Sequence, residues 1–176
     1  MKQFGGIATF IDRDDINTDE IIPAKYLTEI TKQALKPHLL EDLRLEDGSF
    51  DPHSESVQKA SVLVTRSNFG CGSSREHAVW ALEVNDITVV VAGSFARIFR
   101  QNMFNCGILA VELPDEELDR LFGLAPEVRI DVDLEREKLM ATDARGTGIE
   151  CSFSLNPFDR ELVAAGGWLA YADRKY

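Results

Sequence analysis

Strand and helix patterns alternate along the chain between Ser61 and Pro114, and this alternation restricts the possible folds more than any other feature. Short β-branched apolar runs predict strands, and apolar residues at helical spacing predict helices. We expect strands at residues 62–65, 87–92 and 107–113, separated by helices at residues 74–84 and 95–104. A βαβαβ order is typical of a parallel sheet, in which ligands bind beyond the carboxyl ends of the strands.

The segments on either side complete the predicted fold. Residues 4–11 predict a first strand, and alternating residues at 128–134 and 149–155 predict strands with one exposed face. Asn156 and Pro157 begin a last helix, which Gly166 ends. We therefore expect an α/β fold with a central, mostly parallel sheet flanked by helices, plus a C-terminal antiparallel strand pair.

The stretch from Asn68 to Ala78 connects the strand at 62–65 to the first helix. Its glycines, Gly70 and Gly72, permit positive φ and a close approach of the backbone to a ligand. Ser73 and Glu76 have the spacing of a capping box, so we expect Ser73 to be the N-cap. A helix amino end attracts anions, and Arg75 can bind a carboxylate or phosphate through two hydrogen bonds. Two interpretations stay open: Ser73 only caps a helix, or the stretch binds an anion.

Composition and charge argue against several classes of function. The net charge of -11 and the pI near 4.7 disfavour binding to nucleic acid or to an anionic membrane, because both need a basic patch. The glycine stretch lacks the lysine of a Walker A loop and the third glycine of a Rossmann fingerprint. No apolar run has the length of a membrane span, and the first residues show no signal-peptide pattern, so we expect a cytoplasmic protein.

The three cysteines, Cys71, Cys106 and Cys151, are widely spaced and form no C-x-x-C pair. This spacing suggests neither a disulfide framework nor a self-contained zinc site. Cys71 lies in a loop before a helix, where thiolates are favoured, so one interpretation makes it a nucleophile. We favour the other interpretation, a small residue packed beneath the loop.

Three motifs carry a resemblance to a known family. They are Asp-Ile-Asn-Thr-Asp-Glu-Ile-Ile-Pro at 15–23, Gly-Ser-Ser-Arg-Glu-His-Ala at 72–78 and Ser-Phe-Ala-Arg-Ile at 94–98. Together, in this order, they resemble the swivelling domain of the aconitase superfamily, and the chain length resembles that of the free-standing small subunits of 3-isopropylmalate dehydratases. The resemblance implies a swivelling-domain β/β/α fold, with residues 1–176 as a single domain. The chain is irregular and rich in turn residues after Pro23, so we expect a mobile loop or insertion at about 24–60.

The resemblance also implies an activity and roles for four residues. The superfamily consists of hydro-lyases that remove water from a 2-hydroxy di- or tricarboxylate and add it back at the neighbouring carbon. Ser73 matches the serine whose alkoxide takes the carbon-bound proton, and Asp19 matches an acidic residue of the active site. Ser74 and Arg75 match residues that bind substrate oxygens. We expect His77 to brace the loop, because the family does not use it as the main base.

The segment Lys25, Tyr26 and Leu27 is the expected lid over the substrate. Where aconitase brings an arginine, this chain has Lys25, and its neighbours offer apolar surface that suits an alkyl group. The resemblance therefore favours isomerisation of 2- and 3-isopropylmalate through 2-isopropylmaleate, in leucine biosynthesis. Two alternatives stay open: a small subunit of homoaconitase or 2,3-dimethylmalate dehydratase, or a non-catalytic anion-binding or regulatory module.

The family uses a 4Fe-4S cluster as the Lewis acid for the departing hydroxide. Such a cluster needs converging cysteine thiolates, and the three cysteines of this chain lack the family's ligand pattern. The resemblance therefore implies that this chain binds no metal and that a larger partner subunit carries the cluster in a hetero-oligomer.

Overall fold

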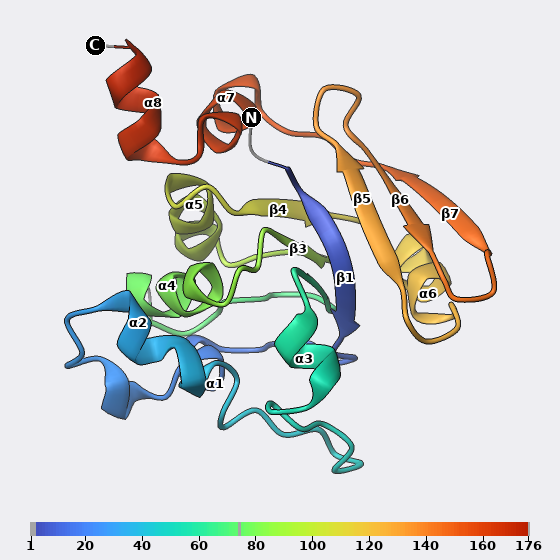
Figure 1. Ribbon diagram of the computed structural model, residues 1–176, viewed down its shortest axis with the longest axis horizontal. Helices are drawn as coiled ribbons and strands as arrows, with labels where there is room; N and C mark the ends of the chain where they lie inside the picture. The colour runs from blue at the N-terminus through green and yellow to red at the C-terminus, as the bar shows by residue number, and fades with distance from the viewer. Residues whose placement is uncertain (1–2, 74, 176) are drawn as a thin grey trace.

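The computed structural model describes residues 3–73 and 75–175, and their strands form one mixed sheet (Figure 1). The strand order is β4-β3-β2-β1-β5-β6-β7, with β1 to β4 parallel to one another and β5, β6 and β7 antiparallel to the strands they pair with. The strands are β1 (Gly5–Phe10), β2 (Val62–Val64), β3 (Val89–Ala92), β4 (Leu109–Glu112), β5 (Arg129–Asp133), β6 (Lys138–Thr142) and β7 (Gly148–Ser152). The predicted α/β fold class is confirmed.

Most helices lie around the parallel half of this sheet, and α6 (Asp115–Phe122) lies against the antiparallel half (Figure 1). The helices are α1 (Thr18–Ile21), α2 (Lys32–Leu35), α3 (Glu55–Lys59), α4 (Glu76–Val84), α5 (Arg97–Asn105), α6 (Asp115–Phe122), α7 (Pro157–Ala165) and α8 (Trp168–Lys175), with short 3-10 helices η1 (Ala24–Tyr26) and η2 (Lys36–His38). Helix α4 contacts α1, α2 and α5, whereas α6 contacts β7 in the antiparallel half. Helices α1 and α2 are therefore packed beside α4, the helix in which the Asn68–Ala78 stretch ends.

Burial explains why these segments form the observed elements. All four residues of β3 are buried, as in a strand covered on both faces. Strands β6 and β7 alternate between exposed and buried residues, which leaves one face of the antiparallel half in water. Helix α7 begins at Asn156, whose side chain accepts a hydrogen bond from Phe158 N, and ends at Gly166 with φ of 98°.

The antiparallel half contains one strand more than the predicted pair. Strand β6 pairs with β5 on one side and β7 on the other, and Leu139 and Ala141 are its buried residues. Glu137, at φ 55°, lies in the tight turn before it. The alternation of β6 covers only five residues and follows a charged turn, which makes its strand signal weak.

The N-terminal third also differs from its prediction. The chain after β1 forms helix α1, and α2 is followed at once by η2, which has Pro37 in its first turn. Helix α3 was not predicted, and residues Trp168–Lys175 form the last helix, α8. The mobility of residues 24–60 stays a prediction.

Candidate active site

The carboxyl ends of three parallel strands bring the three sequence motifs together. Residues after β1 and residues after β2 form a parallel bridge between Asn17 and Cys71, and residues after β2 and β3 form another between Phe69 and Phe95. Phe69 N donates to Ser94 O over 3.1 Å, and Ala96 N donates to Phe69 O over 3.0 Å. The site therefore lies at the sheet edge where α/β folds bind ligands.

Helix α1 contacts the Ser73 loop directly. Thr18 N donates to Cys71 O over 2.9 Å, and Gly70 N donates to Ile16 O over 2.8 Å. The hydroxyl of Thr18, which is buried, lies 3.1 Å from Ser73 Oγ. These contacts join the Asp19 motif to the Ser73 motif across more than fifty positions of sequence.

Gly70 and Gly72 have the positive φ that their places in the stretch predicted. Their φ values are 83° and 98°. A Cβ on Gly70 would lie 2.3 Å from ring atoms of Phe99, and a Cβ on Gly72 would lie 3.4 Å from Thr18 Oγ1. Gly70 is thus required where the loop packs against α5, and the small size of Gly72 allows the loop to approach α1 closely.

The prediction that Ser73 caps a helix is wrong. Helix α4 begins at Glu76, and its N-cap is Arg75, which makes no side-chain capping bond. A capping box does occur in this site, but it belongs to Asn17 and Glu20 at the start of α1. Ser73 is instead exposed in the loop with its hydroxyl beside Thr18, so helix capping does not explain why a serine is present.

The other predicted polar residues have different places. Asp19 is exposed in α1, directly after Thr18, and Arg75 is exposed at the start of α4. Ser74 lies outside the described residues. Thr18 is the residue of the site that sequence reasoning missed, although it belongs to one of the three motifs.

The predicted lid residues Lys25, Tyr26 and Leu27 lie in and directly after η1. The ring of Tyr26 stacks on His38 with centroids 3.8 Å apart, and its hydroxyl donates to Glu41 over 2.8 Å. Burial and this hydrogen bond raise the pKa of Tyr26. Lys25 Nζ lies 3.9 Å from Glu41, so the same carboxylate holds two of the three residues. Leu27 is half-buried.

His77 connects the lid segment to the active-site helix. Its Nε2 lies 3.3 Å from Glu29 O and donates to it, and its ring lies 4.7 Å from that of Trp80. Both contacts agree with the expected bracing role. The hydrogen bond to Glu29 connects the segment after the lid residues to the first turn of α4. None of the described contacts joins the lid residues themselves to Ser73.

The three cysteines lie in three separate elements. Cys71 is in the Ser73 loop, Cys106 is the C-cap of α5, and Cys151 is buried in β7, where Sγ donates to Glu117 over 3.0 Å. Burial, and then the charge of Asp15, raises the pKa of Cys71, which argues against a thiolate nucleophile. Burial and the Glu117 carboxylate raise the pKa of Cys151 to about 12.

The described residues form a cavity beside the Ser73 loop, but no metal-binding group and no membrane-spanning helix. Residues 3–73 and 75–175 contain no group of three His, Cys, Asp or Glu side chains placed to hold a metal ion. None of the described helices is long and apolar enough to cross a membrane. A cavity of about 880 Å³ opens beside Gly70 and Gly72 and is also lined by Arg97, Arg100 and Glu112.

Comparisons with known proteins identify the family. Residues 1–116 match the family described as the aconitase C-terminal domain. The 3-isopropylmalate dehydratase small subunit of Granulibacter bethesdensis is 42% identical over 159 residues, which cover 86% of this chain and 74% of the relative. The small subunit of the same name from Hahella chejuensis is 38% identical over 186 residues, covering 94% and 85%. A crystal structure of 3-isopropylmalate dehydratase from Methanocaldococcus jannaschii has a TM-score of 0.76 at 30% identity, covering 99% of this chain and 95% of that one. The resemblance seen in the motifs is confirmed, and the chain belongs to the family of 3-isopropylmalate dehydratase small subunits within the aconitase superfamily.

Proposed function

We propose that this chain is the small subunit of a hydro-lyase that isomerises 2-isopropylmalate and 3-isopropylmalate, through 2-isopropylmaleate, in leucine biosynthesis. The names of the relatives support the reaction, because both curated proteins are small subunits of this dehydratase. The observation that carries the proposal is the 3.1 Å contact between Ser73 Oγ and Thr18 Oγ1. It gives an exposed serine a hydrogen-bond partner within the site formed by the three motifs.

In this proposal Ser73 Oγ takes the carbon-bound proton of the substrate. A free hydroxyl does not lose its proton at neutral pH, so the alkoxide needs preorganised donors and positive charge. The hydroxyl of Thr18 can donate to Ser73 Oγ, and burial shields that hydroxyl from competing water. Arg75, two residues later, adds a cation that offsets the charge of the alkoxide. Asp19 orients this cationic group from the neighbouring helix.

Substrate binding is assigned to groups on both sides of the loop. Arg75 and Ser74 bind the carboxylate oxygens, for which a guanidinium offers paired donors. Lys25, Tyr26 and Leu27 close over the alkyl end, and residues 24–60 move as a lid on the single domain. Burying the three carbons of the isopropyl group would contribute about 2 kcal/mol at roughly 0.8 kcal/mol per carbon.

A large partner subunit carries the 4Fe-4S cluster in this proposal. Within residues 3–73 and 75–175 the side chains do not fit such a cluster, since Cys71, Cys106 and Cys151 lie in separate elements and do not converge. The name small subunit in the relatives supports a large partner. The steps assigned to this chain are therefore proton transfer at Ser73 and binding of the substrate.

The proposal is tested by co-purification with the large subunit under anaerobic conditions, followed by a substrate panel. The panel compares 2-isopropylmalate, 3-isopropylmalate, homoaconitate and 2,3-dimethylmalate, and the isopropylmalates are expected to have the highest kcat/KM. A complex that prefers homoaconitate or dimethylmalate would reassign the substrate. A chain that forms no complex and supports no turnover would instead be a binding or regulatory module.

A further inference from the structure

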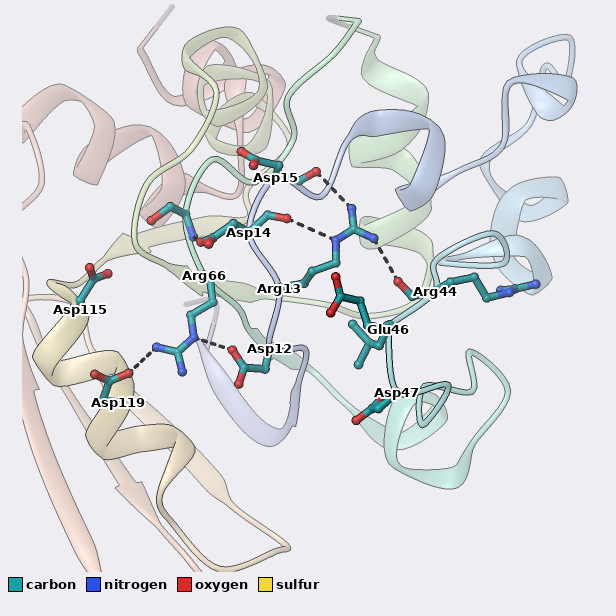
Figure 2. A pocket seen from close by; sticks show the side chains of 12 residues that line it. Asp12, Arg13, Asp14, Asp15, Arg44, Glu46, Asp47, Arg66, Asp115 and Asp119 are labelled. Atoms are coloured by element: carbon teal, nitrogen blue, oxygen red, sulfur yellow. Dashed lines mark hydrogen bonds and ion pairs between the residues drawn. The ribbon is translucent and has the colours of Figure 1, made fainter.

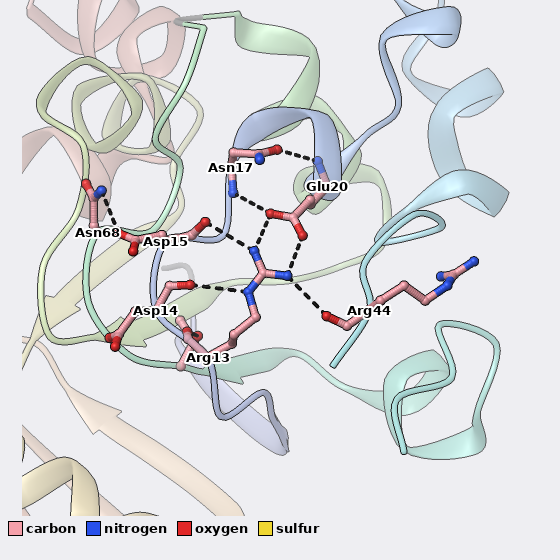
Figure 3. Close-up of polar contacts among 8 residues, drawn as sticks. Arg13, Asp14, Asp15, Asn17, Glu20, Arg44 and Asn68 are labelled. Atoms are coloured by element: carbon pink, nitrogen blue, oxygen red, sulfur yellow. Dashed lines mark hydrogen bonds and ion pairs between the residues drawn. The ribbon is translucent and has the colours of Figure 1, made fainter. Parts of the chain in front are cut away.

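The side chain of Arg13, just after β1, contacts three neighbouring segments (Figure 3). Its guanidinium forms a bidentate ion pair with the Glu20 carboxylate. It also donates to the backbone carbonyls of Asp14, Asp15 and Arg44, each over 3.2 Å. One side chain thus connects the turn after β1, helix α1 and the segment at residue 44.

Glu20 passes this restraint to the amino end of α1. Its Oε1 accepts from Asn17 N over 3.2 Å while Asn17 Oδ1 accepts from Glu20 N over 2.9 Å, so the capping box and the ion pair share one carboxylate. Burial tends to raise the pKa of Glu20, but the hydrogen bonds from Arg13 and Asn17, together with the charge of Arg13, lower it overall. The carboxylate is therefore held in its charged form.

Helix α1 depends on these contacts for its orientation. It has only four residues, whereas an isolated helix needs roughly 12 to 15 residues to be even marginally stable. Thr18 follows the cap, and it is Thr18 that contacts Cys71 O and Ser73 Oγ. A continuous series of contacts thus runs from Arg13 through Glu20 and α1 to the Ser73 hydroxyl.

The same turn holds the other end of the loop. Asp14 Oδ1 accepts from Ser67 N over 2.8 Å, and Asp15 Oδ1 accepts from Asn68 Nδ2 over 2.9 Å. Asp15 N donates to Ser67 O over 2.9 Å. Because Arg13 binds the carbonyls of Asp14 and Asp15, it orients the residues that hold the loop at 67–68 as well as those that hold it at 71–73.

We propose that Arg13 and Glu20 are positioning residues for Ser73: their ion pair fixes α1 and the turn before it, and these hold the Ser73 loop in its reactive geometry. This inference rests on the proposed role of Ser73. In this role they act through α1 and the turn, without contact to the substrate. Loss of the pair should lower kcat by roughly tenfold or more, because a displacement of about 1 Å at a reacting group can cost about 100-fold.

Arg66 supplies a matched control. It lines the same cavity as Arg13, which has a volume of about 1070 Å³ (Figure 2). Arg66 also forms two ion pairs, with Asp12 at 2.7 Å and Asp119 at 2.6 Å, and its guanidinium lies 4.2 Å from the ring centroid of Phe122. Asp119 belongs to α6 and Asp12 directly precedes Arg13, and neither ion pair includes Glu20 or α1. Loss of Arg66 should therefore lower stability and disturb the serine much less than loss of Arg13 does.

The test compares Arg13→Gln, Arg13→Lys, Glu20→Gln and Arg66→Gln in the reconstituted complex, with Ser73→Ala as the reference. Arg13→Gln and Glu20→Gln are expected to lower kcat with little change in KM, and Arg13→Lys is expected to restore part of the loss. Arg66→Gln is expected to lower the unfolding temperature but to leave kcat within about twofold of wild type, since its partly exposed ion pairs act on stability.

The inference is overturned if Arg13→Gln keeps wild-type kcat while Ser73→Ala is inactive, or if Arg66→Gln loses as much kcat as Arg13→Gln. Turnover by Ser73→Ala would instead refute the proposed role of the serine itself. Hydrogen exchange in the isolated subunit gives a readout independent of activity. Gly70 N donates to Ile16 O and Thr18 N donates to Cys71 O, so both amides report on the contact between α1 and the Ser73 loop. Glu20→Gln should accelerate hydrogen exchange at these two amides. Unchanged protection there would contradict the inference.

Discussion

Replacing Gly70 with alanine should destabilise the protein by about 2 to 5 kcal/mol, as the sum of two effects. The φ of 83° costs an L-residue roughly 1 to 2 kcal/mol. The new Cβ would lie 2.3 Å from Phe99, which is fully buried and has its ring 5.5 Å from that of Phe69, so it has little room to move. Overpacking of this kind adds about 1 to 3 kcal/mol.

Gly146 separates the two effects, because it has nearly the same φ, 82°, with nothing within 4 Å of its added Cβ. Gly146→Ala should therefore show only the backbone cost. Urea unfolding of both variants measures the difference, which should be about 1 to 3 kcal/mol. In a double-mutant cycle, Phe99→Leu should cost less in the Gly70→Ala background than in wild type. Equal destabilisation by Gly70→Ala and Gly146→Ala would refute the close packing of the Ser73 loop on α5.

Three more predictions concern the thiol, the antiparallel half and the lid. Cys71→Ala should retain turnover in the reconstituted complex, because burial raises the pKa of this thiol, and an inactive but folded variant would revive the nucleophile interpretation. Hydrogen bonds from Ala125 N, Thr147 N and Arg145 N lower the pKa of Asp143 below the unfolded value of about 3.9. Its stabilising contribution is thus present above about pH 4 and is lost as the pH falls through the folded pKa, so the urea midpoints of wild type and Asp143→Asn should converge on acidification. A gap that stays constant from pH 7 to pH 2 would contradict this sign. Exchanging residues 25–28 for those of a homoaconitase small subunit should change the kcat/KM ratio between isopropylmalate and homoaconitate, and an unchanged ratio would remove the lid assignment.

The parts of the fold that local patterns specify could be predicted from the sequence. The uncharged run that forms β3 and the Asn156 and Gly166 ends of α7 depend on burial periodicity and capping chemistry, which act over a few residues. Strand β6 and helices α1 and α3 were missed because each is only four or five residues long. Segments of this length carry little periodic signal, and tertiary contacts determine whether they form.

In the candidate active site, too, local patterns predicted some features and tertiary contacts determined the others. The sequence indicated the glycines and the serine, but it contains two capping-box patterns in these motifs, Ser73 with Glu76 and Asn17 with Glu20, and each could mark a helix start. Only the second does so, because the Ser73 hydroxyl pairs with Thr18 instead. The spacing of Asn17 and Glu20 was a usable signal for α1. No local pattern could identify the contact between Thr18 and Ser73, since it depends on the parallel pairing of β1 with β2.

The central claim, that Ser73 is the base which this chain brings to a two-subunit enzyme, is tested most directly by Ser73→Ala in the anaerobically reconstituted complex. The account predicts a variant that folds, binds the large subunit and keeps a KM near that of wild type. Its kcat for 2-isopropylmalate should fall by roughly 100- to 10,000-fold, as expected when a general base is removed. Wild-type kcat in that variant would contradict the account.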